Sequence, residues 1–101
     1  MDKETYKQKL YKTAEILKAL GHPARLCIVC RLMLKDYNVS HIQDCLELPQ
    51  STVSQHLAIL KAKGIIKGQR KGVEVIYSIA NDDVKKIINA LFEPEVMKAL
   101  E

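Results

Sequence analysis

Residues 50–66 read QSTVSQHLAILKAKGII, which is a helix pattern followed by a stop and the start of a strand. The apolar residues that recur three and four positions apart, on one side of an α-helix, are Val53, Leu57 and Leu60. Gly64 is a residue type that ends helices, and Ile65 begins a β-like run. The stretch therefore predicts a helix over residues 50–63 with one buried face, and a strand after it.

A shorter amphipathic segment precedes this helix, and a tight turn separates the two. Ser40 can cap the shorter helix, and Pro49 ends it. Its inward-facing residues are Val39, Ile42, Leu46 and Leu48. Ser51, or Thr52 with Gln55 three residues later, can cap the longer helix. Two short helices with a tight turn between them form a helix-turn-helix.

Residues 66–76 have the pattern of a β-hairpin. The first run breaks around residues 68–72, between two glycines. The returning run then shows the two-residue period of a half-buried strand. On its inward side it places Val73, Val75, Tyr77 and Ile79. A hairpin directly after a helix-turn-helix is a wing.

Further helices are predicted on both sides of this unit. A first amphipathic helix ends at Gly21, and its apolar residues are Tyr6, Leu10, Leu17 and Leu20. Pro23 suits the first turn of a second helix over residues 24–34, which is apolar on all sides and therefore central. Residues 35–38 form a polar break between this helix and the next.

The carboxyl-terminal part predicts one more helix, capped by Asn81 or Asp82. Its apolar stripe consists of Val84, Ile87, Ile88, Leu91 and Phe92. Pro94 interrupts this helix, and the apolar residues beyond it, Val96, Met97 and Leu100, predict a further turn or two. The predicted fold class is mainly α with a small β-hairpin, a winged helix-turn-helix in the order α-α-α-α-β-β-α.

Positive charge is concentrated in one segment. Residues 48–73 contain no acidic side chain and five basic ones, Lys61, Lys63, Lys67, Arg70 and Lys71. These supply a charge of +5, whereas the whole chain carries only +4, so the remainder is close to neutral. A localised basic stripe is typical of proteins that bind the phosphate backbone of DNA. The alternative is a solvated lysine-rich hairpin.

The length of 101 residues allows one modest hydrophobic core, so we expect a single domain over residues 1–101. No run of about 18 apolar residues is present, and the first residues lack the apolar stretch of a secretory signal. A cytoplasmic protein without membrane contact is therefore expected. Three cysteines, an odd number, favour reduced thiols over a disulfide framework.

Three segments resemble the ArsR/SmtB winged-helix transcriptional repressors. They are residues 22–26 (HPARL), residues 50–57 (QSTVSQHL), and Ile65 with Ile66 leading into a glycine-bounded wing. The resemblance implies a homodimeric repressor that sits on a palindromic operator and leaves it when an inducer binds or a thiol is modified. No Gly-rich phosphate loop, clustered catalytic carboxylates or defensible Cys/His pair is present, so an enzyme is not expected.

The start of the helix over residues 50–63 is polar, and the amino-terminal residues of a recognition helix contact base edges. The candidates for contact with DNA there are Gln50, Ser51, Thr52, Ser54, Gln55 and His56. Base contact is expected from these except Thr52, because Gln pairs with adenine and Ser or Thr with several bases. Ser51 and Thr52 are equally well explained as capping residues. We assign the five basic residues to phosphates, with Arg70 at the wing tip directed towards the minor groove.

A domain of this size cannot bury the apolar faces of both terminal helices in one core, which predicts a dimer made by the first and last helices. Such a dimer presents two recognition helices to successive major grooves about 34 Å apart. In the alternative, a monomer, the stripe from Val84 to Phe92 covers its own core.

Metal sensors of the ArsR/SmtB family commonly use a Cys-x-Cys motif at the third helix, or Asp and His ligands on the last helix. Residues 37–41 (YNVSH) and 82–91 (DDVKKIINAL) contain neither pattern. We therefore predict no metal site and no cofactor, and the inducer stays unidentified.

The three thiols, Cys27, Cys30 and Cys45, are first interpreted as packing residues, because two of them lie in the most apolar helix. A Cys27–Cys30 disulfide is disfavoured, since side chains at i and i+3 of a helix are too far apart. Some thiol sensors of the family carry a cysteine where Cys30 lies, but their partner on the last helix is missing here. Pairing of Cys27 or Cys30 with Cys45, or across the dimer, remains open. A redox- or persulfide-responsive repressor that uses Cys27, Cys30 or Cys45, and a winged-helix module that binds protein, are the alternatives.

Overall fold

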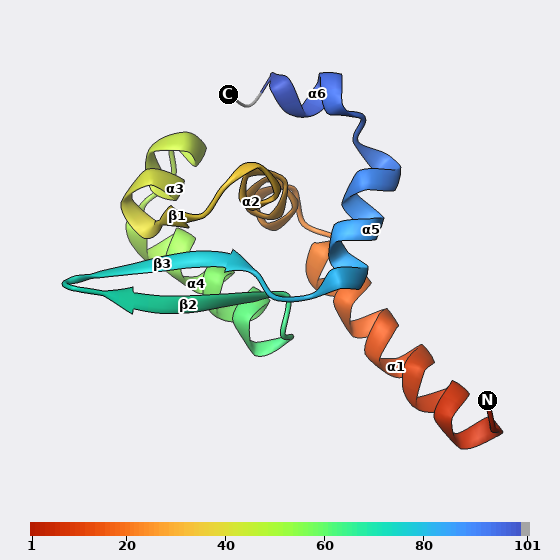
Figure 1. The fold of residues 1–101 in the computed structure, drawn as a ribbon. Coiled ribbons are helices and arrows are strands. Elements are labelled where there is room, and N and C mark those ends of the chain that lie inside the picture. The colour runs from red at the N-terminus through yellow and green to blue at the C-terminus, as the bar shows by residue number, and fades with distance from the viewer. Residues whose placement is uncertain (100–101) are drawn as a thin grey trace.

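The computed structural model describes residues 1–99. In chain order the elements are α1 (Lys3–Leu20), α2 (Pro23–Leu34), β1 (Tyr37–Asn38), α3 (Val39–Leu46), α4 (Gln50–Ala62), β2 (Ile66–Lys71), β3 (Glu74–Ile79), α5 (Asp82–Leu91) and α6 (Pro94–Lys98). The fold is mainly helical with a small antiparallel sheet, and it is a winged helix-turn-helix, as the sequence predicts (Figure 1).

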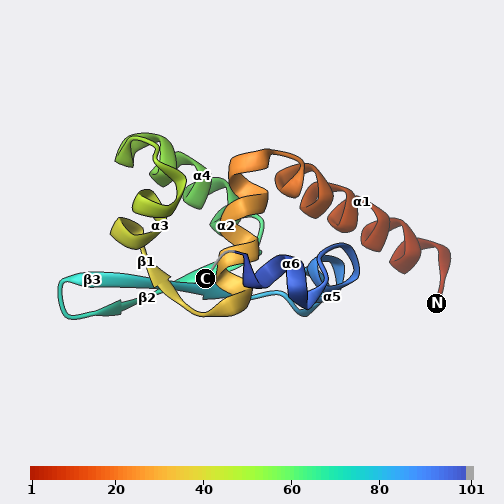
Figure 2. The same cartoon turned by 90° about the horizontal axis from the view of Figure 1, so that it is seen from above.

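Helix α2 is the centre of the structure. Figure 2 shows it between the α3–α4 pair on one side and α5 with α6 on the other. Ile28 and Val29 are fully buried, and Cys30 and Leu32 nearly so. One cluster of buried apolar side chains joins α2 to every other helix and to the sheet. The predicted burial of this helix is confirmed.

The helix-turn-helix consists of α3 and α4, and its predicted caps were wrong. The side chain of Asn38, not Ser40, caps α3, because its Oδ1 accepts the backbone N–H of His41 at 2.8 Å. Helix α4 begins at Gln50 without any side-chain cap. Ser51 and Thr52 therefore lie inside its first turn, where their hydroxyls are not engaged in capping.

The sheet has three strands in the order β1-β3-β2, one more than expected. Tyr37 pairs with Tyr77 and Asn38 with Ile76, so part of the expected polar break is a strand. A strand of two residues is too short to show the two-residue hydrophobic period by which strands are predicted. Tyr37 is nevertheless only 9% exposed, and its burial ties the start of α3 to β3.

The hairpin also differs in detail from its prediction. Strand β2 continues through Gly68, which pairs with Tyr77 of β3. Glycine fits this position because a Cβ added there would lie 2.8 Å from Cγ1 of Val75 and 3.2 Å from Cε1 of Tyr77. The strands turn at Gly72, whose φ is +65°, and at Val73. Val73 is 96% exposed and belongs to this turn, so the returning strand begins at Glu74.

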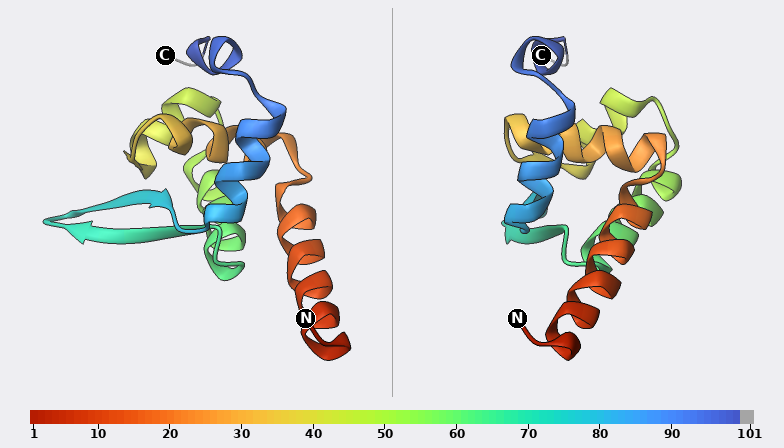
Figure 3. Two further views of the ribbon diagram at one scale, coloured as in Figure 1. Left: turned by 45° about the vertical axis from the view of Figure 1, so that its right-hand side comes forward. Right: turned by 90° about the vertical axis from the view of Figure 1, so that its right-hand side faces the viewer.

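The terminal helices are only partly covered. Figure 3 shows the amino-terminal half of α1 extending away from the rest of the chain. Asn81 caps α5 through its Oδ1, which accepts the N–H groups of Asp83 and Val84. The turn predicted after Pro94 is α6, although Leu100 lies outside the described residues. No helix among residues 1–99 is long and apolar enough to cross a membrane.

The cap of α3 gives a direct test of this local structure. Replacing Asn38 by Ala removes the cap and the hydrogen bond that Asn38 Nδ2 donates to Glu74 on the wing, 3.0 Å away. We expect Asn38→Ala to lower the free energy of unfolding by about 1 kcal/mol in urea denaturation. The matched control is Ser40→Ala, which should leave it unchanged. A larger decrease for Ser40→Ala than for Asn38→Ala would contradict the assignment.

Candidate nucleic-acid interface

Helix α4 has one buried face and one exposed face. Val53, Leu57 and Leu60 are buried in the core. The exposed side chains at its amino-terminal end are Gln50, Ser51, Ser54 and Gln55, whereas Thr52 and His56 are half-buried. Four of the six side chains predicted to contact DNA at the start of α4 are therefore exposed together, at the end with which a recognition helix contacts base edges.

His56 faces the start of α2. Its ring centroid lies 4.6 Å from that of His22, and its Nδ1 lies 3.4 Å from Nη1 of Arg25. Burial and, after it, the charges of His22 and Arg25 lower the pKa of His56 below its ordinary value. This contact was not foreseen from the sequence, because residues 25 and 56 are 31 positions apart.

The wing carries three exposed basic residues, all on β2. Figures 1 and 2 show the β2–β3 hairpin extending beyond the helices. Lys67 and Lys71 lie on one face of the strand and Arg70 on the other, since successive side chains alternate. The tip is Gly72 and Val73, so Arg70 lies two residues before the tip rather than at it.

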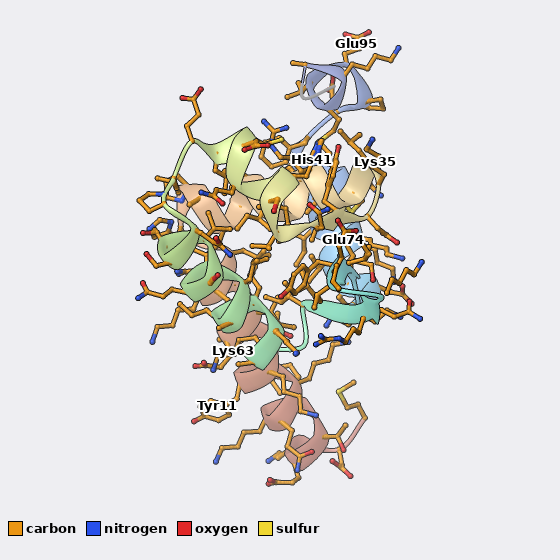
Figure 4. The ribbon with its side chains drawn as sticks, turned by 90° about the vertical axis from the view of Figure 1, so that its left-hand side faces the viewer. Tyr11, Lys35, His41, Lys63, Glu74 and Glu95 are labelled. Atoms are coloured by element: carbon orange, nitrogen blue, oxygen red, sulfur yellow. The ribbon has the colours of Figure 1, made fainter. Side chains whose placement is uncertain are left out.

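The two lysines at the end of α4 differ from each other. Lys61 is exposed. Lys63 donates to Oε2 of Glu15 on α1 at 2.8 Å, and Figure 4 shows its position at the α1 side of the molecule. This hydrogen bond and the charge of the Lys63 ammonium hold the pKa of the Glu15 carboxyl below its ordinary value. Contact with a phosphate would therefore have to compete with an acid 48 positions away in the sequence.

Two of the three thiols lie at an apolar cavity beside α2. Cys27 and Cys30 line an apolar cavity of about 300 Å³ between α2 and α6, together with Pro23, Leu26, Phe92, Val96 and Met97. Burial, and to a smaller extent Cys27, raises the pKa of the Cys30 thiol, which is only 5% exposed. Cys45, on α3, is half-buried and does not line this cavity. In residues 1–99, no three His, Cys, Asp or Glu side chains are grouped so that they could hold a metal ion.

The structure thus places seven of the predicted DNA-contacting residues in two exposed groups, on two elements that pack against each other. One is the exposed polar end of α4, and the other is the basic edge of β2. Their common surface is polar and basic, without the large aromatic side chains that anchor most protein interfaces. The three residues whose placement the sequence did not show are His56, Lys63 and Arg70.

The comparisons with known proteins cover the same elements. The family model described as "Bacterial regulatory protein, arsR family" matches residues 22–67. The transcriptional repressor PagR of Bacillus anthracis is 49% identical over 79 residues, which are 77% of this chain and 79% of PagR. The crystal structure of PagR matches with a TM-score of 0.78 and 46% identity, covering 84% of this chain and 98% of that chain.

Two further solved structures match over most of the chain. HlyU from Vibrio cholerae, named a transcriptional activator, has a TM-score of 0.79 and 33% identity, covering 90% of this chain and 94% of its own. The homodimeric winged helix-turn-helix DNA-binding domain of a Mycobacterium bovis protein has a TM-score of 0.79 and 26% identity, covering 90% and 83%. The chain belongs to the ArsR/SmtB family of winged helix-turn-helix transcriptional regulators.

Proposed function

We propose that the protein is a homodimeric transcriptional repressor that binds a two-fold symmetric operator through α4 and the β2–β3 wing and is released by an inducer. The observation that carries the proposal is that α4, with its exposed polar amino-terminal end, packs against the exposed basic strand β2. In this proposal, α4 and the wing belong to a single domain over residues 1–101. The protein acts in the cytoplasm, where its operator DNA lies.

Within this proposal the two groups of side chains have different tasks. Gln50, Ser51, Ser54 and Gln55 contact base edges in the major groove, because their amides and hydroxyls match several base patterns. Thr52 and His56, which are half-buried, lie at the border of that surface. The basic residues contact phosphates, which set affinity and register rather than sequence preference. They are Lys61, Lys63, Lys67, Arg70 and Lys71, with Arg70 extending to the minor groove beside the wing.

Exposed apolar side chains on α1 and α5 support the dimer. Tyr6, Leu10, Tyr11 and Leu17 are at least half exposed on α1. Leu91 on α5 is 68% exposed. Contact between these faces and a second copy would bury apolar surface, and such burial stabilises by about 25 cal/mol for each Å² removed from water. The homodimeric M. bovis domain, which shares the fold, supports the same assembly.

Repression is favoured over activation by the relatives. PagR, at 49% identity, is named a repressor, and HlyU, at 35% identity, is named an activator. A repressor needs only to occupy its operator, which a chain of this size with one DNA-binding surface can do. Lowered transcription from the bound promoter is therefore the expected effect.

A thiol switch is not the function that the structure favours. The thiolate is the reactive form of cysteine, and burial of Cys30 opposes its formation. Cys27 and Cys30 lie three positions apart on a regular helix, a spacing that disfavours a disulfide between them. The inducer therefore stays unidentified in this proposal.

Specific DNA binding is tested by fluorescence anisotropy on a duplex from the region upstream of the protein's own gene, against a scrambled duplex. We expect tighter binding to the former, with an affinity that falls steeply as salt rises. Equal binding to both duplexes would contradict the proposal.

A phosphate contact by Lys67 is tested by the salt dependence of binding. In Lys67→Gln, the slope of log affinity against log salt concentration should become shallower by about one unit for each phosphate that the lysine no longer neutralises, so by about two in a dimer. Lys86→Gln, on the exposed side of α5, is the matched control and should leave the slope unchanged.

The dimer is tested by a charge on the apolar face of α1. We expect Leu10→Glu to shift the protein from dimer to monomer in analytical ultracentrifugation, because an unpaired carboxylate would be buried at the contact. Val73→Glu places the same charge on an exposed turn of the wing and should leave the dimer intact. A wild-type chain that sediments as a monomer, or a Leu10→Glu variant that still dimerises, would contradict the α1 contact.

Thiol reactivity should follow burial. In the native protein, we expect iodoacetamide to modify Cys27 and Cys45, which are half-buried, faster than Cys30. Mass spectrometry of the peptides measures the three rates, and unfolding in urea should make them similar. If Cys30 reacts fastest in the folded chain, its thiol is activated and the redox alternative returns.

A further inference from the structure

The segment His22-Pro23-Ala24-Arg25 has no part in the DNA contacts above, although it meets the recognition helix. Arg25, in the first turn of α2, lies between two other helices. Its Nε donates to the backbone carbonyl of Ala19, near the end of α1, at 2.6 Å. Its Nη1 lies 3.4 Å from Nδ1 of His56, in the middle of α4. One guanidinium therefore contacts α1 and α4 from α2.

We propose that Arg25 is a positioning residue for DNA binding, which holds the recognition helix α4, through His56, against the end of α1. The four residues Ala19, His22, Arg25 and His56 are called the α1–α2–α4 junction below. The proposal rests on the proposed function, because α1 is there the dimer helix and α4 the DNA-contacting helix. The junction then fixes the direction of α4 relative to the dimer, and thereby the spacing of the two recognition helices.

The chemistry of the contact fixes the protonation of His56. A guanidinium has only donors, so Nδ1 of His56 must accept and cannot carry a proton. The ring is then neutral, with its proton on Nε2. A protonated His56 has no acceptor at Nδ1, and its charge would also repel Arg25. The low pKa of His56 agrees with this, since burial, His22 and Arg25 all disfavour the charged ring.

The charged and titratable groups that face His56 are His22 and Arg25, both from the start of α2. The contribution of α1 to the junction is the backbone carbonyl of Ala19, which accepts a hydrogen bond from Arg25. His22 is itself engaged, because its Nδ1 accepts the backbone N–H of Ala24 at 3.1 Å and caps α2. Along α4, Lys63 lies two turns further on and pairs with Glu15. Glu15 is held by Lys63, and neither of the groups that act on the charge of His56 is acidic.

The consequence is an unusual pH dependence. Protonation of histidines ordinarily adds positive charge and strengthens DNA binding as pH falls. Here protonation of His56 breaks the junction, so affinity is full where the ring is neutral and is lost as pH falls through its folded-state pKa. That pKa lies below the ordinary value of 6.5, and the decline therefore occurs on the acid side of it.

The test combines operator affinity from about pH 5.5 to about pH 8 with three variants. Wild-type affinity should fall at the acid end. His56→Gln keeps an acceptor that does not titrate, so its affinity, whatever its value at neutral pH, should no longer decline at the acid end. Arg25→Met keeps the apolar stem without the donors and should bind about ten-fold more weakly at neutral pH. His41→Gln, on the exposed side of α3, is the control and should behave as wild type.

A double variant separates positioning from simple loss of stability. If Arg25 acts through His56, Arg25→Met combined with His56→Met should bind no more weakly than the weaker of the two single variants Arg25→Met and His56→Met. Additive decreases in affinity would overturn the proposal, as would wild-type affinity that rises steadily as pH falls, or Arg25→Met binding at the wild-type level.

The junction can also be tested without DNA, which distinguishes its failure from that of the proposed function. NMR titration of the folded protein should place the pKa of His56 below its ordinary value with Nδ1 unprotonated. Arg25→Met should raise that pKa, because a neighbouring cation and a donor to Nδ1 are removed. An unchanged His56 titration in Arg25→Met would overturn the junction even if the operator binds. Absence of specific DNA binding with a normal junction would instead reject the proposed function.

Discussion

Helix α4 buries Val53, Leu57 and Leu60 in the core, and this one-sided burial is the constraint on which the interface depends. Because these three side chains fix the rotation of the helix, its polar residues must lie on the outside. The same core includes Ile65 and Ile66, directly after α4, so the wing leaves the body at a fixed place beside it. Hydrophobic packing thus holds the helix with the polar end and the basic strand against each other in one body.

Electrostatics then differentiates the exposed residues. Of the five basic side chains in residues 48–73, Lys63 is engaged by Glu15, whereas the three on β2 extend from a hairpin that has little core of its own. An ion pair between exposed groups contributes little to stability, about 0 to 1 kcal/mol, so its effect here is mainly to lower the local positive charge. The basic surface is therefore centred on the wing more than on the end of α4.

Much of the fold could be predicted from the sequence, since its long periodic segments carry strong signals. The α2 burial, the α3–α4 pair, the hairpin and the Asn81 cap follow from local pattern. What escaped prediction depends on residues far apart in the chain. Strand β1 exists because Tyr37 pairs with Tyr77, and Asn38 caps α3 because that pairing sets the backbone just before the helix.

The candidate interface was predictable to a similar extent. The polar end of α4 could be found because residue type and helix position suffice for it. No local pattern predicts the contact of His56 with Arg25, which lie 31 positions apart, or that of Lys63 with Glu15, which lie 48 positions apart. Gly68 is a different case. Glycine is a residue type that predicts the end of a strand, but Gly68 lies within β2, where Val75 and Tyr77 of β3 leave no room for a side chain. Only the packed structure shows this difference.

The most direct test of DNA binding through α4 and the wing is a map of the residues that contact DNA, made by NMR chemical-shift perturbation of the full chain with its upstream duplex. We expect the perturbed amides to concentrate at residues 50–56 and 66–76, with few on α6. Perturbations concentrated on α5 and α6, or none that distinguish the upstream duplex from a scrambled one, would contradict this interface.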